Sequence, residues 1–189
     1  YYDTMAPTVS YWDCGEFIAV SHTLGVPHPP GSPLYLLLGR VASMLPISKD
    51  IAFRVNLLSP IVSAFSVLFL YLIIVQLVNN WRGKISSNVD ALIVFGSGII
   101  GSMTFAFTDS HWFNAVEAEV YAFSTFFTAI VVWLILVWNE KADERGNERY
   151  ILLIAYMLGL ATGLHLLNLL TIPFVALVIY FRKFNFELR

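Results

Sequence analysis

Residues 55–78 read VNLLSPIVSAFSVLFLYLIIVQLV, a stretch without charge whose only strongly polar side chains are Asn56 and Gln76. An α-helix needs about 20 mostly apolar residues to cross a bilayer core of about 30 Å. The stretch meets both requirements, so it predicts a transmembrane helix. It also indicates the fold class, because the rest of the chain contains further apolar stretches of this kind.

Three further apolar stretches follow it. Residues 91–107 carry no charge and are rich in small side chains, which allow membrane helices to pack closely. Residues 120–138 are dense in Phe, Val, Ile and Trp. Residues 150–181 are uncharged, but a single helix of that length would extend about 48 Å. We therefore divide them near residues 165–171, with Pro173 opening the second half, and predict spans at 150–166 and 171–183.

The composition agrees with a membrane protein. Hydrophobic residues make up 58% of the 189 residues and charged residues 13%, against about 25% in soluble domains. The net charge of −2 gives no reason to expect a nucleic-acid partner. The single cysteine, Cys14, excludes an intrachain disulfide and a cysteine zinc site. We predict an all-α, polytopic transmembrane helix bundle over residues 1–189, forming the N-terminal part of a longer protein.

Basic residues predict the orientation of the bundle. Eight of the eleven Lys and Arg residues lie after the first span, after the third span and in the tail: Arg82, Lys84, Lys141, Arg145, Arg149, Arg182, Lys183 and Arg189. Alternating crossings place all three segments on one side, which the positive-inside rule makes cytoplasmic. The opposite side receives residues 3–54, the turn at 109–119 and the turn at 165–168. All four histidines fall there, so we expect any active site to face outward.

The outward segment 3–54 is too polar and too rich in proline to span a membrane. We expect two short helices on the membrane surface, one from about Trp12 to Leu24 and one over residues 34–44. Asp13 and Glu16 share a helix face. Their spacing fits a capping box, with Asp13 at the N-cap and Glu16 reaching back. It equally fits a carboxylate that acts as a general base or metal ligand at the water–lipid boundary.

Other polar groups of this segment allow two interpretations each. His28 precedes three prolines within five residues, so its imidazole either bonds a nearby carbonyl in a rigid turn or is held toward a phosphate or sugar. Arg40 and Arg54 are the outward guanidinium groups, with Lys49 as a third cation. A membrane-embedded phosphate needs such a group.

The second outward turn, residues 109–121, is the densest cluster of polar and aromatic residues, and we count its His111, Asn114 and Tyr121 among the candidate contacts to the donor phosphate or substrate. Trp112 and Tyr121 fit an aromatic belt at the membrane interface. Glu117 and Glu119 lie at the mouth of a span, where unpaired carboxylates are costly, and an extended turn would let both flank one ligand.

His165 and Asn168 interrupt the last apolar run, three residues apart. They fit either an interhelical hydrogen bond, worth about 0.6 kcal/mol, or a polar contact that lines the same outward cavity.

Several motifs resemble a known family. These are the W-D-C-G-E stretch at 12–16, H-P-P-G at 28–31, F-R-V-N at 53–56, A-V-E-A-E-V-Y at 115–121 and G-L-H-L-L-N at 163–168. Together they resemble a bacterial family of multi-pass membrane proteins of unknown function, which is similar to the eukaryotic membrane enzyme that O-mannosylates plexin-type receptor domains. The resemblance covers essentially the whole chain.

The resemblance implies a glycosyltransferase of the GT-C superfamily, which moves a sugar from a polyprenyl-phosphate lipid to a protein or glycan acceptor on the non-cytoplasmic side. In that superfamily the first outward loop usually carries a catalytic Asp, and Asp13 occupies the matching place. Some relatives use a divalent metal held by acidic pairs, a part that Glu117 and Glu119 would take, although the chain has no Asp-x-Asp motif. The implied location is a bacterial inner membrane with the site facing the periplasm or exterior, or the endoplasmic reticulum membrane in a eukaryote.

A transporter or flippase for a lipid-linked or anionic solute is the alternative function. It would use the same outward cavity, with Glu117, Glu119 and His165 as a proton relay. Transporters usually carry ionisable groups at the membrane midplane and show internal repeats. The predicted spans hold almost no ionisable residue apart from His165, and no repeat is visible, so the transferase is favoured.

Overall fold

A computed structural model describes residues 1–83 and 85–184, and over these ranges the chain is helical, without a strand. The helices, in chain order, are η1 (Tyr2–Thr4), α1 (Cys14–Thr23), α2 (Pro33–Met44), α3 (Ile51–Asn56), α4 (Leu58–Arg82), α5 (Asn88–Ala106), α6 (Asp109–Ala115), α7 (Val120–Lys141), α8 (Glu148–Thr162), η2 (Leu166–Leu170) and α9 (Thr171–Lys183). The predicted all-α class is confirmed.

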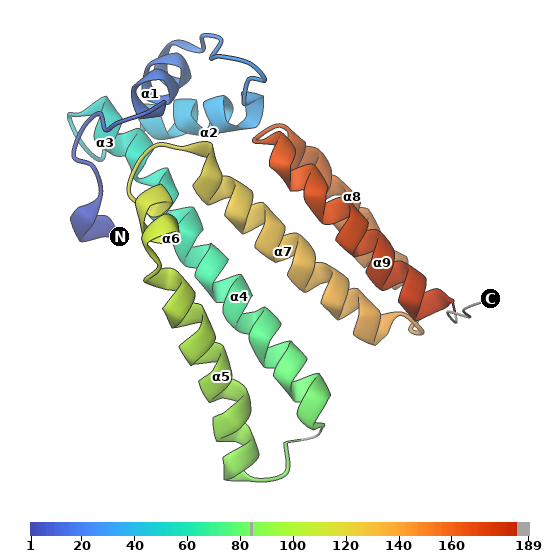
Figure 1. The fold of residues 1–189 in the computed structure, drawn as a ribbon. Coiled ribbons are helices and arrows are strands. Elements are labelled where there is room, and N and C mark those ends of the chain that lie inside the picture. Colours follow the sequence, from blue (N-terminus) through green and yellow to red (C-terminus); the bar gives the residue numbers. More distant parts are fainter. Residues whose placement is uncertain (84, 185–189) are drawn as a thin grey trace.

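The helices divide into a bundle and a cap at one of its ends (Figure 1). The long helix α4 packs between α5 and α7, and α7 also packs against α8 and α9. The short helices α1, α2, α3 and α6 gather with the N-terminus at the end of the bundle where α4 and α7 begin. We call this group of short helices and their loops the cap.

Four helical stretches are long and apolar enough to cross a membrane: Ile51–Arg82, Asn88–Ala106, Val120–Lys141 and Leu166–Lys183. Helices occur at all five stretches where the sequence predicts spans. The break in the last apolar run falls at Gly163–His165, just before the predicted division. The helix α8 has 15 residues and is not among the four, because it would extend only about 22 Å.

The sequence did not predict α3 and α6, which have six and seven residues. Both are too short for a helical periodicity to stand out. A capping signal does mark α3, since Asp50 at its N-cap accepts a hydrogen bond from the Ala52 backbone N–H at 2.8 Å. The segment that contains α6 was expected to be a turn because of its many polar residues.

The loops after α4 and α7, together with the end of α9, lie at the end of the bundle opposite the cap (Figure 1). The basic residues of these segments therefore share one end, as the orientation argument requires. Lys84 and Arg189, which also entered that argument, lie outside the described residues. Which membrane face this end occupies stays a prediction.

The cap packs on the bundle through an aromatic cluster. The buried Tyr35 of α2 makes edge-to-face contacts with Phe17 of α1 and Phe123 of α7, at centroid distances of 5.1 and 5.5 Å. Such pairs contribute about 1 kcal/mol beyond the area that they bury. Two hydrogen bonds orient the cap on the bundle. The Leu34 N–H donates to the Gly163 carbonyl at 2.9 Å, and the Ser32 hydroxyl donates to the Leu164 carbonyl at 2.8 Å. The start of α2 is thereby fixed to the turn after α8.

Glycines of α5 let it approach α4 closely, as the small residues of this span predict. A Cβ atom built on Gly98 would lie 2.6 Å from Val75 Cγ2 and 2.8 Å from the Tyr71 ring. One on Gly96, two residues earlier in the same helix, meets nothing within 4 Å. Within lipid, close van der Waals contact of this kind replaces the hydrophobic effect as the cause of helix association.

We predict opposite effects of the same substitution at these two positions. Gly98→Ala should destabilise the protein by about 1–3 kcal/mol, because a β-branched side chain and a rigid ring must move. Gly96→Ala, the matched control, should be neutral or stabilise by up to about 1 kcal/mol through reduced backbone entropy. The measurement is thermal unfolding of the detergent-purified full-length protein. Equal melting temperatures for the two variants would contradict the packing described here.

Candidate active site

The buried side chain of Asn56 joins three segments of the cap. It is fully buried at the end of α3, where its Nδ2 donates to the carbonyls of Ala6 and Thr8 at 2.8 and 2.9 Å. Its Oδ1 accepts from the Ala118 backbone N–H at 3.0 Å and from Cys14 Sγ at 3.6 Å. The N-terminal strand-like segment, the first residue of α1 and the loop before α7 are therefore all held to one amide.

A second contact strengthens this junction. The Ala6 backbone N–H donates to the Val116 carbonyl at 2.8 Å, which pairs the N-terminal segment with the loop between α6 and α7. Burial raises the pKa of the Cys14 thiol, so Cys14 stays a neutral donor toward the amide. The two outward segments of the sequence analysis, separated by about 100 residues, consequently meet.

A cavity of about 250 Å³ opens where they meet. Its lining comes from the residue before α1, from α6, from the following loop and from the start of α7: Trp12, Asp13, Phe113, Asn114, Glu117, Glu119 and Tyr121. The sequence predicted that Asp13 and the Glu117–Glu119 pair share one face of the protein. The structure places them in a single cavity, with Asn114 and Tyr121 beside them.

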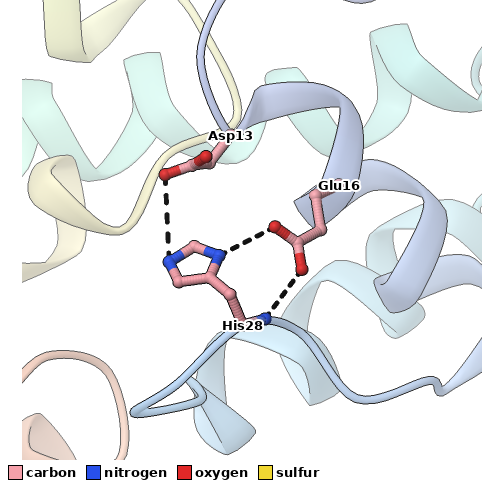
Figure 2. Close-up of side chains that lie close together, drawn as sticks. All are labelled: Asp13, Glu16 and His28. Carbon is pink, nitrogen blue, oxygen red and sulfur yellow. Dashed lines mark hydrogen bonds and ion pairs between the residues drawn. The ribbon is translucent and has the colours of Figure 1, made fainter.

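Beside this cavity, His28 lies between the carboxylates of Asp13 and Glu16 (Figure 2). Glu16 accepts two hydrogen bonds from His28, both at 2.7 Å: one from the backbone N–H to Oε1 and one from the ring Nδ1 to Oε2. The other ring nitrogen, Nε2, faces Asp13 Oδ2 at 3.9 Å. The two hydrogen bonds that His28 donates to Glu16 therefore set the orientation of the imidazole and direct Nε2 toward Asp13.

The predicted capping box is wrong. Asp13 does occupy the N-cap of α1, but its side chain makes no capping hydrogen bond, and Glu16 points to His28 instead of back to Asp13. The hydrogen bonds from the His28 ring and backbone lower the pKa of Glu16. The same side-chain bond, helped by the charges of Glu16, Asp13 and Glu119, raises the pKa of His28.

Glu117 and Glu119 are almost completely buried, at 1% and 4% exposure. Glu117 Oε1 has no hydrogen-bond partner among the described residues. Desolvation, together with the negative charges of Asp13 and Glu117, raises the pKa of Glu119 to about 7. The loop that carries both residues is not helical, and both side chains reach the same cavity, as the sequence predicted for a non-helical turn.

Trp12 and Phe113, which the sequence analysis did not single out, line the cavity with Tyr121. Trp12 is 83% exposed, and its φ of 59° places it in the left-handed region that non-glycine residues rarely adopt. A bulky residue in this conformation is a local strain that marks a functional position in many proteins. Its place next to Asp13 in the sequence was the signal available.

Arg40 and Arg54 are not part of the cavity lining. The Arg40 guanidinium donates to the carbonyl of His22, near the far end of α1 from Asp13. Nine residues of helix separate the two positions by about 14 Å. Arg54 donates to the carbonyls of Ser43 and Ser48, each at 2.7 Å. Both guanidinium groups hold the backbone of the cap in place.

Two other predicted site residues lie in the protein framework. His111 is buried against the rings of Tyr1 and Phe105, and this burial lowers its pKa. Asn168 is buried and accepts hydrogen bonds from the hydroxyls of Ser124 and Thr128 on α7, which confirms the interhelical alternative.

His165 lies at the edge of the candidate site. Its Nδ1 accepts from the Leu167 N–H and so caps η2, while its ring lies 5.4 Å from that of Tyr121, which lines the cavity. His165 therefore packs against a residue that lines the cavity.

The group of ligand atoms best placed to hold a metal differs from the predicted one. Among the described residues, one ligand atom from each of Asp13, Glu16 and His28 falls within 4.8 Å of the others. The predicted pair Glu117 and Glu119 does not belong to this group, although both share the cavity with Asp13.

Comparisons with known proteins identify the family of the chain. The family model described as "Protein O-mannosyl-transferase TMEM260 N-terminal domain" matches residues 13–188. The protein O-mannosyl-transferase tmem260 of Dictyostelium discoideum is 32% identical over 186 residues, covering 90% of this chain and 21% of the relative. The TMEM260 protein of Mus musculus is 29% identical over 149 residues, covering 79% and 19%. The chain thus spans about a fifth of the length of these curated relatives, and no solved structure matches it significantly.

We predict that Asn56→Ala destabilises the cap. The substitution leaves the Ala118 N–H and two carbonyls without their partner in a buried place, which costs about 3 kcal/mol. The control is Asn80→Ala, which removes one exposed hydrogen bond to Glu140 and should change stability by less than about 0.5 kcal/mol. Thermal unfolding in detergent measures both, and an unchanged melting temperature for Asn56→Ala would show that the junction is not needed.

Proposed function

We propose, from the premise that this chain belongs to the protein O-mannosyl-transferase TMEM260 N-terminal domain family, that it carries the catalytic cavity of a membrane mannosyltransferase of GT-C type. The donor is a mannosyl polyprenyl phosphate, and the acceptor is a hydroxyl group of a protein. The observation that carries the proposal is the cavity itself, in which Asp13 from one cap segment meets Glu117 and Glu119 from the other.

The position of the cavity suits a donor of this kind. A polyprenyl phosphate keeps its tail in the hydrocarbon core and its phosphate and sugar at the surface. The cavity lies in the cap, at the ends of helices long and apolar enough to span the membrane. The cap end is the one without the clustered basic loops, so we place it on the non-cytoplasmic side. That side is the periplasm or exterior for a bacterial protein and the lumen for a protein of the endoplasmic reticulum.

The reaction requires a base at this place. The acceptor oxygen attacks the anomeric carbon of the mannose, the bond from that carbon to the phosphate oxygen breaks, and the lipid phosphate leaves with the electron pair. The proton of the acceptor hydroxyl passes to the carboxylate of Asp13. Asp13 suits this role because its side chain is 54% exposed and makes no capping bond, so it is free to meet an incoming hydroxyl.

The remaining lining fits a sugar. One face of a hexose ring carries mostly C–H groups, which pack on aromatic rings such as those of Trp12, Phe113 and Tyr121. Sugar hydroxyls donate to carboxylates, and Asn114 and the buried Glu117 lie in the same cavity. The combination of aromatic rings and acidic groups therefore matches the two surfaces of a mannose better than it matches an inorganic anion.

The departing phosphate needs a positive partner. Of the three groups predicted for it, His28 lies next to Asp13, whereas Arg40 and Arg54 are held by carbonyls elsewhere in the cap. His28 is accordingly the side chain beside which we place the phosphate.

The transporter alternative finds little support in the same geometry. Glu117, Glu119 and His165 lie in or beside the cap, at one end of the long helices, and not at their middle. A relay across the membrane would need ionisable groups near the midplane.

We predict that Asp13→Asn lowers mannosyl transfer by about 10²–10⁴-fold, because loss of a general base costs about that factor. The matched control is Asp3→Asn, an exposed charge in the same N-terminal region outside the cavity, which should keep full activity. The assay measures transfer from a mannosyl polyprenyl phosphate to an acceptor protein by the purified full-length protein. Full activity of Asp13→Asn, with unchanged insertion and melting temperature, would overturn the assignment of the base.

A further inference from the structure

The acidic groups of the site raise an electrostatic problem. Asp13, Glu16, Glu117 and Glu119 supply four carboxylates, and no Lys or Arg occurs among the described residues that line the cavity. Even a fully protonated His28 supplies only one positive charge. Uncompensated buried carboxylates are costly in a protein interior, and Glu117, at 1% exposure, has an oxygen without any partner in the part of the chain described.

The facing atoms of His28 and Asp13 define where a cation fits. Glu16 accepts from Nδ1, so this nitrogen keeps its hydrogen, and a cation that displaces the proton of Nε2 meets the lone pair of that nitrogen. Nε2 and Asp13 Oδ2 are then two acceptors that face each other across 3.9 Å. Two ligands on neighbouring positions of an octahedral ion, at about 2.1 Å from it, lie about 3 Å apart. Both side chains are about half exposed, so a shift of about 1 Å is within their reach.

The geometry points to a divalent-cation site in which His28 Nε2 and Asp13 Oδ2 are ligands and Glu16 holds the imidazole. A histidine ligand of a metal typically donates its other ring N–H to a carboxylate, which fixes its orientation, and Glu16 makes this contact at 2.7 Å. Oxygen ligands with one imidazole suit Mn²⁺ and similar ions of intermediate hardness. Glu117 and Glu119, on the other wall of the cavity, add negative charge toward the same ion.

The site also deepens the proposed function and, in this part, rests on it. A polyprenyl-phosphate donor is an anion, and four carboxylates repel it. A divalent ion between Asp13 and His28 offsets two of these charges and gives the phosphate oxygens a positive centre to bind, while the second oxygen of Asp13 remains available for the acceptor hydroxyl.

The test is direct binding of Mn²⁺, followed by electron paramagnetic resonance, to the full-length protein purified in detergent and stripped with a chelator. We expect a saturable site in the wild type. His28→Gln and Glu16→Gln should each weaken the affinity at least tenfold, since removal of a ligand or of its orienting carboxylate typically costs 10–100-fold. The matched control, His22→Gln, changes a histidine at the far end of α1, bonded to Ser43, and should bind Mn²⁺ as the wild type does.

Coupling of the bound Mn²⁺ to a ¹⁴N nucleus, lost in His28→Gln, is a second readout that a general loss of structure would not produce selectively. The site is overturned if the wild type binds no Mn²⁺, or if His28→Gln and Glu16→Gln bind it like His22→Gln. Mannosyl transfer is measured separately, with and without chelator. Transfer that depends on Asp13 but not on Mn²⁺ would overturn the part of the cation in the reaction, and variant-sensitive Mn²⁺ binding without transfer would overturn the proposed function alone.

Discussion

The buried amide of Asn56 is the constraint on which the geometry of the cap depends. An amide has two donor hydrogens and one acceptor oxygen, and here both ends are used, toward Ala6 and Thr8 on one side and toward Cys14 and Ala118 on the other. In a buried place each lost partner would leave a polar group unsatisfied, so the three segments cannot separate independently. The distance between Asp13 and the Glu117–Glu119 loop follows from this junction, because each lies next to a residue that Asn56 holds.

The bundle follows from the sequence because membrane insertion depends on length and hydrophobicity, which are local properties. Uncharged stretches such as residues 55–78 and 120–138 form helices in the expected places, and the break in residues 150–181 lies near the expected point because one helix would be too long. The helices α3 and α6 were not predicted, because six or seven residues are too few to show a clear period. Their stability comes from tertiary contacts, as the buried positions of Ala52 and His111 indicate.

The cluster of acidic residues on one side of the protein was predictable, because topology alone assigns Asp13 and Glu119 to the same side. The contacts between individual side chains could not be predicted in the same way. The spacing suggested that Glu16 caps α1. Instead, the loop after Gly25 brings His28 to Glu16, which accepts one hydrogen bond from the imidazole and one from the backbone N–H of His28. The positive charges of Arg40 and Arg54 would suit a phosphate. Both guanidinium groups instead donate to nearby carbonyls, because the loops of the cap leave many backbone acceptors without a partner in a helix.

A cavity whose charged lining residues are all acidic is a poor receptor for a phosphate and a good one for hydroxyls. The proposed reaction needs a place for each. The carboxylates of Asp13, Glu117 and Glu119 favour the neutral sugar and acceptor, whose hydroxyls donate to them. The anionic leaving group needs positive charge at one place only, on the side of the cavity where His28 faces Asp13. In the proposed reaction, positive charge at this place attracts the phosphate as its bond to the anomeric carbon breaks, while the second oxygen of Asp13 stays available to the acceptor hydroxyl. Glu16 holds the imidazole that defines this place.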